Sequence, residues 1–326
     1  MEKGICLGCL RESSASFCRR CTNELTGGRK INPVLQFSLP EFTEYKLKHA
    51  GRLSISGAQI KHLLKFEKNR FVLSDAGGEY ILKPVPHGSL FHLDTVPANE
   101  HLTMQIARQL FGIETAANTM VSFADGAPAY ITGRFDFSPS GARYIVEDFA
   151  QIAGLTEETD GAEYKYKYSY EGIARLISRY VAASAIELEK FFRLVLFNYV
   201  FSNGDAHLKN FSLYRNEEYG DYLLTPAYDL LCTKIHSPFE SDLALDLFAD
   251  DFQSENYKHG TKYTAADFLE FAKRLNIPSS RAKKFMEEYN KKKTGVEQII
   301  SKSFLPNEIK TEYLKLFLDK TNRLSY

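Results

Sequence analysis

The order of segments along this chain constrains its fold more than any single motif does. Up to about residue 150 the sequence shows short β-favouring runs and one helical pattern, whereas helical patterns dominate beyond it and enclose one hairpin. Strands gathered in one half of a chain and helices in the other predict an α+β fold. Because 326 residues can bury a large core, we expect two lobes, a β-rich N-lobe and a mostly helical C-lobe.

The first half contains most of the expected strands. In NRFVLSDAGGEYILKP two β-favouring runs flank Asp75-Ala76-Gly77-Gly78 and predict a hairpin whose second strand ends at Pro84. Asn99 is the expected N-cap of a helix, because Asn favours that position. The other elements expected in this half are a helix over roughly 100–111 and strands near 119–123, 129–136 and 143–150.

Helices are expected over 171–183 and 186–201 and again from about residue 264 onward. The second of them, IELEKFFRLVLFNYVF, carries apolar residues nearly all round, so it should be buried. A short hairpin in FSLYRNEEYGDYLLTPAYDLL interrupts the helices.

Four of the five cysteines fall in CLGCLRESSASFCRRC as two CxxC pairs, formed by Cys6, Cys9, Cys18 and Cys21. Two such pairs can supply four thiolates to a tetrahedral Zn²⁺. The alternatives are two disulfides or a reduced, loosely ordered tail. The fifth, Cys232, lies in an apolar stretch and is expected to be a buried structural thiol.

Composition excludes several classes of protein. The formal net charge is zero, which argues against nucleic acid as the main partner of the whole chain. No apolar run reaches the roughly 18 residues that suggest a membrane span, and the N-terminus lacks the apolar core of a signal peptide. We therefore expect a cytoplasmic protein without a membrane partner.

The stretch NYVFSNGDAHLKN follows the expected buried helix and gathers polar residues, among them Asp205, His207 and Asn210. Phosphoryl transfer needs a carboxylate to orient a hydroxyl and an Asn or Asp to hold Mg²⁺. The catalytic loop of protein kinases has the same spacing between its Asp and its Asn. By itself this spacing also fits an ordinary polar turn.

Three further features raise the significance of that loop. The small-residue stretch RLSISGAQIK (52–61) can bring backbone N–H groups close to phosphates, or it is a plain connection. Lys83 at the end of its strand is costly to bury without an anion, unless it extends to solvent at an edge. Asp229, in apolar LLTPAYDLL, could bind Mg²⁺ or cap a helix. Taken in order, these features match the parts of an ATP-dependent kinase.

The motifs SISGAQIK, YILKP, NEHLTMQIARQLFGI, GRFDF, EDFAQ, NGDAHLKNFSLY and TPAYDLL resemble those of the HipA family of bacterial serine/threonine kinases, the toxins of toxin–antitoxin pairs. The likeness spans about residues 50–320. It implies a bilobal, protein-kinase/PI-kinase-like fold that uses ATP and Mg²⁺. The small four-cysteine zinc knuckle expected from the cysteine spacing would precede this fold. The modules expected are the zinc knuckle (1–28), a connector (29–50), the ATP-binding N-lobe (51–150) and the helical C-lobe (151–326).

The resemblance also implies roles for individual residues. Asp205 would be the catalytic base, Asn210 and Asp229 would hold Mg²⁺, and Lys83 would contact an ATP phosphate. The inhibitory autophosphorylated serine would be Ser54 or Ser56. The residues expected to line the nucleotide site are Ser56, Gly57, Ala58, Gln59, Lys83, Glu147, Phe149, His207, Asn210 and Asp229, with Glu147 and Phe149 at the adenine hinge.

The chain departs from the family pattern in three places. About 50 residues, which hold the cysteine cluster, precede the loop, so the N-terminal subdomain of longer members has no room; in short members of the family this subdomain can be a separate protein. Ile60 stands where the family often has Glu. His207 stands two residues beyond the base, where protein kinases often have a cation, and neutral His would offset the charge of the transferring phosphate less well.

The sequence therefore predicts a HipA-like serine/threonine protein kinase that is regulated by autophosphorylation. The family's substrates include aminoacyl-tRNA synthetases, and its usual partner is an antitoxin, through which nucleic acid would be contacted only indirectly. Two alternatives remain open: a pseudokinase that acts as a binding module, and a small-molecule or lipid kinase on the same fold.

Overall fold

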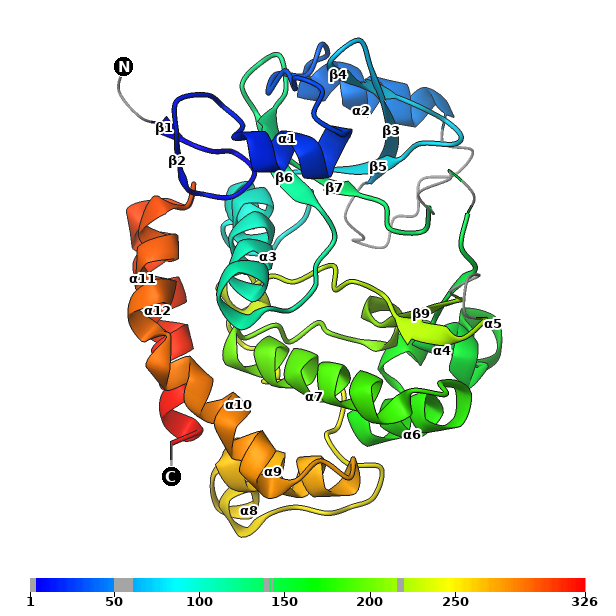
Figure 1. The fold of residues 1–326 in the computed structure, drawn as a ribbon, viewed down its shortest axis with the longest axis vertical. Coiled ribbons are helices and arrows are strands. Elements are labelled where there is room, and N and C mark those ends of the chain that lie inside the picture. Colours follow the sequence, from blue (N-terminus) through cyan, green and yellow to red (C-terminus); the bar gives the residue numbers. More distant parts are fainter. Residues whose placement is uncertain (1–3, 50–60, 138–140, 142, 216–219, 326) are drawn as a thin grey trace. The chain divides into compact units, whose positions relative to one another are not determined.

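The structure is a computed structural model that describes residues 4–49, 61–137, 141, 143–215 and 220–325. The chain divides into two compact units (Figure 1). Unit 1 consists of Met1–Gln105, Ala116–Arg134 and Gln298–Lys310, and unit 2 of Ile106–Thr115, Phe135–Glu297 and Thr311–Tyr326. The α+β fold is confirmed, while the finer module boundaries expected from the sequence stay a prediction.

Unit 1 is built around an antiparallel sheet. Its elements, some of which continue into unit 2, are β1 (Gly4–Ile5), β2 (Glu12–Ser13), α1 (Arg19–Thr26), α2 (Leu39–His49), β3 (His62–Glu67), β4 (Arg70–Leu73), β5 (Tyr80–Pro84), η1 (Leu93–Thr95), α3 (Val96–Phe111), β6 (Asn118–Ser122), β7 (Pro128–Gly133), α11 (Lys293–Lys302) and α12 (Asn307–Arg323). Within the described residues the sheet has five strands in the order β4-β3-β5-β7-β6.

This strand order corrects the hairpin expected around Asp75–Gly78. β4 and β5 do not pair with each other, since both pair with β3, which lies between them. The true hairpin joins β3 to β4 through Lys68 and Asn69, which have φ of 47° and 65°. Two residues with positive φ match the twist of a tight hairpin, but such turns usually carry glycine. The glycine-rich stretch instead leads from β4 past β3 to β5.

One face of the sheet packs against the N-terminal segment. The core there joins Leu25 of α1 and Phe42 of α2 to strand residues such as Leu82 and Ile131. The stretch interpreted as a connector therefore contains a helix, and part of it belongs to the core of unit 1. Residues alternate across a strand, so Lys83 lies on the opposite face from Leu82.

Helix α3 begins earlier than the sequence predicts. It starts at Val96, so Asn99 lies inside the helix and is fully buried, and its expected role as N-cap is wrong. Pro97 explains the difference, because proline is tolerated in the first turn of a helix. The early start places Glu100 and His101 well inside the helix.

Unit 2 is mostly helical. Its elements are β8 (Val146–Asp148), α4 (Phe149–Ala153), α5 (Glu157–Asp160), η2 (Tyr164–Tyr166), α6 (Tyr170–Tyr180), α7 (Ser184–Val200), η3 (Leu208–Asn210), β9 (Ser212–Arg215), β10 (Tyr222–Leu224), η4 (Thr233–Ile235), α8 (Glu255–Gly260), α9 (Ala265–Arg274) and α10 (Ser279–Lys291). In the described part of this unit, strands pair in the order β10-β9-β8.

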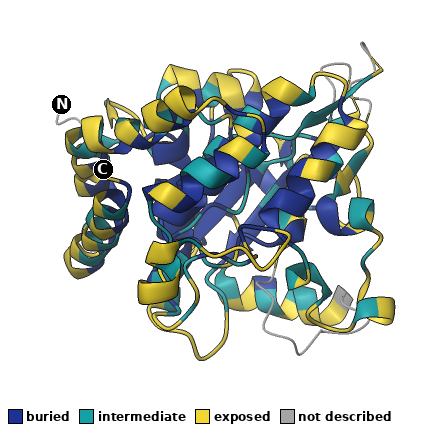
Figure 2. Ribbon diagram, turned by 90° about the horizontal axis from the view of Figure 1, so that it is seen from below, coloured by how far each residue is buried: buried dark blue, intermediate teal, exposed yellow. Residues whose placement is uncertain are grey.

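The predicted burial of the long helix is confirmed. From Phe191 to Val200, all but one of the residues of α7 are buried, and aromatic rings from other elements surround it. Most other helices present one buried and one exposed side (Figure 2). Since α7 ends inside this core, the polar loop that follows starts from a fixed point. Cys232 is buried as expected, and burial raises the pKa of its thiol.

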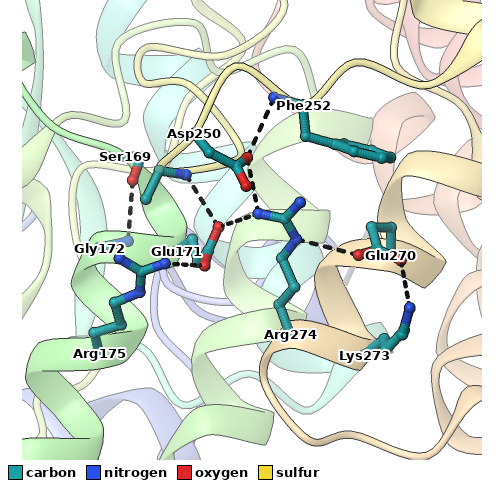
Figure 3. A network of polar contacts seen from close by, with 10 residues as sticks. Ser169, Glu171, Gly172, Arg175, Asp250, Phe252, Glu270, Lys273 and Arg274 are labelled. Carbon is teal, nitrogen blue, oxygen red and sulfur yellow. Dashed lines mark hydrogen bonds and ion pairs between the residues drawn. The ribbon is translucent and has the colours of Figure 1, made fainter.

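Arg274 of α9 joins several segments of unit 2 (Figure 3). Its guanidinium donates to Glu171 of α6 at 2.7 Å, to Asp250 at 2.9 Å and to Glu270 at 3.2 Å. Burial disfavours the Glu171 carboxylate, but the N–H of Ala249 and the guanidinium of Arg274 outweigh burial and lower the pKa of Glu171. The network fixes α6 against α9 through charge-assisted hydrogen bonds.

Among the described residues, the helices are all too short or too polar to span a bilayer.

Candidate active site

The loop after α7 is held in place by hydrogen bonds from several elements. Asn203 Nδ2 donates to Asn198 Oδ1 of α7 at 3.0 Å and to the carbonyl oxygen of Asp229 at 3.3 Å. The N–H of Gly204 donates to Thr233 Oγ1 at 2.7 Å, and Tyr170 Oη donates to the carbonyl of Ala206 at 2.8 Å. Residues distant in sequence therefore determine the path of the loop.

Gly204 is required at its position by packing. A Cβ atom built there would lie 2.6 Å from the carbonyl oxygen of Ser241 and 2.7 Å from the carboxyl carbon of Glu240. Thr233 Oγ1 donates to Glu240, which lies directly against the loop. Burial raises the pKa of Glu240 to about 7, and the charge of Asp205 contributes in the same direction.

Asp205 is exposed, and its carboxylate meets a tyrosine. Tyr166 of η2 donates from Oη to Asp205 Oδ1 at 2.5 Å. Burial, followed by this hydrogen bond, raises the pKa of the Tyr166 phenol, so the proton stays on the tyrosine. The Asp205 backbone is fixed as well, because its carbonyl accepts from the N–H of His207 at 2.8 Å.

Asn210 and Asp229 lie next to each other, as the Mg²⁺ prediction requires. Asn210 Nδ2 donates to Asp229 Oδ2 at 3.3 Å, and Asn210 Oδ1 accepts from the N–H of His207 at 3.1 Å. Asp229 has φ of 55°, a left-handed conformation that few residues other than glycine adopt and that occurs often at functional sites. The pair thus offers one carboxylate and one amide group at a constrained position.

His207 is buried and supports Tyr166. The two rings meet edge to face, with centroids 5.2 Å apart. Burial lowers the pKa of His207, with Lys165 acting in the same direction and Asp205 opposing it. A lowered pKa favours the neutral form of the imidazole, and the place of His207 in a nucleotide site stays a prediction.

Lys83 lies in unit 1, buried opposite the core face of the sheet. Its Nζ lies 2.7 Å from Glu100 Oε1 of α3 and 5.7 Å from the ring centre of Tyr130 on β7. A buried lysine is expected to need a nearby anion, and Glu100 supplies at least part of that negative charge. An ion pair between a strand lysine and a helix glutamate is also a required part of protein kinases.

Glu147 and Phe149 flank the end of β8 in unit 2. Glu147 is exposed, whereas Phe149 is fully buried and its N–H donates to the carbonyl of Phe211 at 3.0 Å. Asp148 between them forms an ion pair with Lys209 of the loop at 2.7 Å, which connects β8 to η3. Any adenine contact from Phe149 would have to come from its backbone carbonyl, because its side chain lies in the core.

The predicted phosphate loop lies outside the described residues. This applies to Ser54, Ser56, Gly57, Ala58 and Gln59, so their expected roles stay predictions. A cavity of about 500 Å³ in unit 1 is lined by Lys46, Lys61, His62, Leu63, Ser74, Asp75 and Ile81. None of the predicted site residues that the structure describes lines this cavity.

The four clustered cysteines are brought together by the N-terminal knuckle. The ligand atoms of Cys6, Cys9, Cys18 and Cys21 all lie within 4.8 Å of one another, and no two of them form a disulfide. Tetrahedral Zn²⁺ with bonds of about 2.3 Å needs sulfur atoms about 3.8 Å apart. The observed 3.7 Å between Cys9 and Cys18, and 3.5 Å between Cys18 and Cys21, fit that geometry.

The knuckle is docked on the rest of unit 1. His101 Nε2 of α3 lies 3.3 Å from the carbonyl of Gly8, and Thr119 Oγ1 of β6 donates to the carbonyl of Leu7 at 3.1 Å. The N–H of Met120 donates to the same Leu7 carbonyl at 3.1 Å. A metal in the knuckle would therefore stabilise a segment that contacts both α3 and the sheet.

Sequence reasoning did not find Glu100, Tyr166 or Glu240. Glu100 was quoted only as part of a helix, although a buried strand lysine signals that a carboxylate must lie near it. Tyr166 stands in EYKYKYSY, where several tyrosines alternate with lysine and no local signal distinguishes one of them. Glu240 lies in a polar loop, and only its contact with Gly204 gives it a role.

Comparisons with known proteins identify the family of this chain. A family model described as the HipA-like C-terminal domain matches residues 53–296. A Haemophilus influenzae protein named "Putative kinase" is 30% identical over 319 residues, covering 90% of this chain and 88% of that protein. "Putative kinase Y4dM" of Sinorhizobium fredii is 31% identical over 279 residues, covering 79% of this chain and 64% of that protein.

Two solved structures share the fold. HipA of Shewanella oneidensis, in a complex with HipB and its operator DNA, matches with a TM-score of 0.65 and 20% identity, over 91% of this chain and 71% of that chain. The Helicobacter pylori proinflammatory kinase CtkA matches with a TM-score of 0.51 and 15% identity, over 81% and 94%. At these identities the two matches establish the fold alone.

Proposed function

This chain belongs to the HipA-like kinase family, and from that premise we propose that it is an ATP- and Mg²⁺-dependent serine/threonine protein kinase. The observation that carries the proposal is the grouping of Asp205, Asn210 and Asp229 in unit 2, with Asn210 Nδ2 3.3 Å from Asp229 Oδ2. Phosphoryl transfer consists mainly of positioning and charge compensation, and these residue types supply both.

Asp229 and Asn210 are the residues that would hold Mg²⁺. Carboxylate and amide oxygens suit this hard cation. Asn210 Nδ2 donates to Asp229 Oδ2 and Asn210 Oδ1 accepts from the N–H of His207, so Mg²⁺ would be bound by the Asp229 carboxylate and by the remaining lone pair of Asn210 Oδ1. When bound, Mg²⁺ would offset the charge that develops on the β- and γ-phosphates. Asp205 would orient the acceptor hydroxyl and take its proton, a role that its exposed carboxylate allows.

Lys83 would contact an ATP phosphate while paired with Glu100. The buried ion pair holds the ammonium group of Lys83 at a fixed position on β5. This arrangement supports the proposal, because protein kinases need the same pair intact for activity. Glu147, Phe149 and His207 are proposed to line the nucleotide site, with the Phe149 contribution coming from its backbone.

We extend the proposal to regulation through the loop at 52–61. Ser54 or Ser56 would be autophosphorylated, and Gly57, Ala58 and Gln59 would bring backbone N–H groups to the ATP phosphates. A phosphate on either serine adds about −2 charge and would repel the loop from the nucleotide.

The knuckle is proposed to bind one structural Zn²⁺ through Cys6, Cys9, Cys18 and Cys21. The sulfur separations and the absence of disulfides among these cysteines support it. The Zn²⁺ would have a structural role, since four thiolates leave no open coordination position.

Partners follow from the family relationship. The Shewanella HipA structure is a complex with HipB and operator DNA, and we propose an antitoxin partner of that kind here, with any DNA contact made through the antitoxin. A separately encoded N-terminal subdomain protein is a second proposed partner. Among protein substrates, an aminoacyl-tRNA synthetase is the class to test first.

The direct test incubates the purified chain with γ-labelled ATP and Mg²⁺ and follows label on the chain and on lysate proteins. Asp205→Asn should abolish labelling, whereas Asp251→Asn, an exposed carboxylate elsewhere in unit 2, should leave it unchanged. General-base loss typically costs about 10²–10⁴-fold in rate. Labelling that is absent from the parent protein, or equal in the parent and Asp205→Asn, contradicts the proposed function.

A further inference from the structure

We propose that Tyr166 acts as a stand-in for the acceptor: its hydroxyl occupies, on Asp205, the hydrogen-bonding position that the substrate's hydroxyl takes during phosphoryl transfer. The turn that carries Tyr166 must then move before an acceptor can be phosphorylated. This inference rests on the proposed function, because it needs Asp205 to be the base.

The first observation is the contact itself. Tyr166 Oη donates to Asp205 Oδ1 at 2.5 Å. A substrate serine or threonine has the same kind of donor, a hydroxyl, and must approach a general base to about 2.6–3.2 Å. A carboxylate has about four acceptor sites, so the acceptor competes with Tyr166 when it approaches Oδ1 along the line that Tyr166 occupies, which is the approach proposed here.

The second observation is the support beneath the tyrosine ring. The edge-to-face contact with His207 holds the ring over the catalytic loop. His207 is itself fixed, since its N–H donates both to the Asp205 carbonyl and to Asn210 Oδ1. Lys165 Nζ lies 4.9 Å from the centre of the Tyr166 ring. The sequence left the role of His207 open, and in the structure its ring supports the ring of Tyr166.

The third observation is that the turn is short and is flanked by exposed residues. Tyr166 belongs to η2, one turn of 3₁₀-helix closed by the bond from the Tyr166 N–H to the Glu163 carbonyl at 3.0 Å. Such turns have poorer hydrogen-bond geometry than α-helices. The neighbouring residues 161–163 and Lys167 are exposed, and segments of this kind open at low free-energy cost.

Tyr166 forms and breaks no covalent bond in the proposed reaction. During transfer the acceptor oxygen bonds to the γ-phosphorus, the bond from that phosphorus to the bridging oxygen breaks, and ADP leaves with the electron pair. The acceptor proton passes to Asp205 Oδ1, which Tyr166 has vacated. Tyr166 therefore restricts turnover to acceptors that bind well enough to displace it.

The test compares Tyr166→Phe and Tyr166→Ala with Tyr168→Phe, a control two residues away whose ring packs over Gly172. Two rates are measured: hydrolysis of Mg-ATP, with water as acceptor, and phosphorylation of a synthetic peptide spanning residues 50–62. Loss of a hydrogen bond to a charged group should raise both rates about tenfold or more. The KM for the peptide should fall while the KM for ATP is unchanged, and Tyr168→Phe should match the parent.

A second comparison shows whether the effect passes through Asp205. In an Asp205→Asn background, Tyr166→Phe should change neither rate, because no base remains to be released. If the parent protein turns over ATP and neither Tyr166 variant raises the rate, the inference is overturned while the proposed function stands. A fall in kcat also overturns it, since Tyr166 would then position Asp205 rather than cover it. Phosphate found on Tyr166 would show that Tyr166 is itself an acceptor, which also overturns the inference. If parent and variants all lack ATP turnover, the proposed function fails and the inference fails with it.

Discussion

Lys83 on β5 and Glu100 on α3 form a buried ion pair, with 2.7 Å between Nζ and Oε1 and at most 8% of either side chain exposed. Ion pairs of this kind contribute little net stability, but removal of one partner leaves a buried charge without its counterion. The pair therefore links the stability of unit 1 to the proposed position of the ATP-contacting lysine.

Glu100→Gln should destabilise the chain by roughly 3–5 kcal/mol, because it removes a carboxylate that pairs with the buried Lys83 ammonium. Chemical denaturation measures this change. The matched control is Lys83→Met combined with Glu100→Leu, which replaces both charges by apolar groups and should recover most of the stability. The double variant should still bind ATP poorly. If it binds ATP as the parent does, Lys83 has no role at the phosphates.

Asp229→Asn should remove the negative charge of this residue and leave its backbone conformation unchanged. Asn adopts the left-handed region at least as readily as Asp, so the free energy of unfolding should change little, while the Mg²⁺ concentration for half-maximal activity rises. Asp229→Ala should lose about 1–2 kcal/mol in addition, because φ of 55° is strained for alanine. Mg²⁺ titrations measure the change in Mg²⁺ requirement, and unfolding curves measure the change in stability. An unchanged Mg²⁺ requirement in Asp229→Asn would rule out this residue as a ligand.

Gly204→Ala should distort the catalytic loop. Its Cβ would meet the Ser241 backbone at 2.6 Å, and backbone cannot yield as a flexible side chain can. We expect a loss of about 1–3 kcal/mol, as for other overpacked sites, and a large loss of activity. Gly260→Ala is the control, since nothing lies within 4 Å of its Cβ. Full activity in Gly204→Ala would show that the loop has more space than the structure gives it.

Glu240 should make the folded chain less stable as pH rises. Burial raises its folded pKa to about 7, against about 4.3 in an unfolded chain. The folded state thus binds more protons between these values, so the associated stability is complete below about pH 4.3 and is lost as pH rises to about 7. Relative to Glu240→Gln, the parent should lose about 1–2 kcal/mol across that window, after a discount for partial exposure. Parallel stability profiles for the two proteins would contradict this assignment.

Removal of zinc should lower the stability of unit 1. Protein purified without chelator should contain about one zinc per chain, and a strong chelator should lower its Tm. Gly8→Ala should reduce zinc content, because its Cβ would lie 2.8 Å from Cys21 Sγ. Gly4→Ala is the control in the same knuckle, with its nearest atom at 3.9 Å. Metal analysis of the parent that finds no zinc would refute the site.

Local patterns were sufficient for several features of this protein. The continuous apolar surface of α7 predicted burial because a helix can hide all its faces only inside a core. The spacing of the four cysteines predicted their convergence, since two CxxC pairs suit one tetrahedral ion. The motifs around Asp205 and Asp229 predicted the family, because their residue types and order are local properties of the chain.

Other features depended on contacts between segments far apart in sequence, and only the tertiary structure decided them. The β3–β4 turn uses Lys68 and Asn69, although DAGG has the stronger local turn signal, because strand pairing across the sheet outweighed that preference. Glu100 was identified by its packing against β5, and Tyr166 by the contact of η2 with the catalytic loop. The sequence alone determined which chemical groups are available, and long-range packing determined which of them meet, since the energy of such a contact depends on both segments at once.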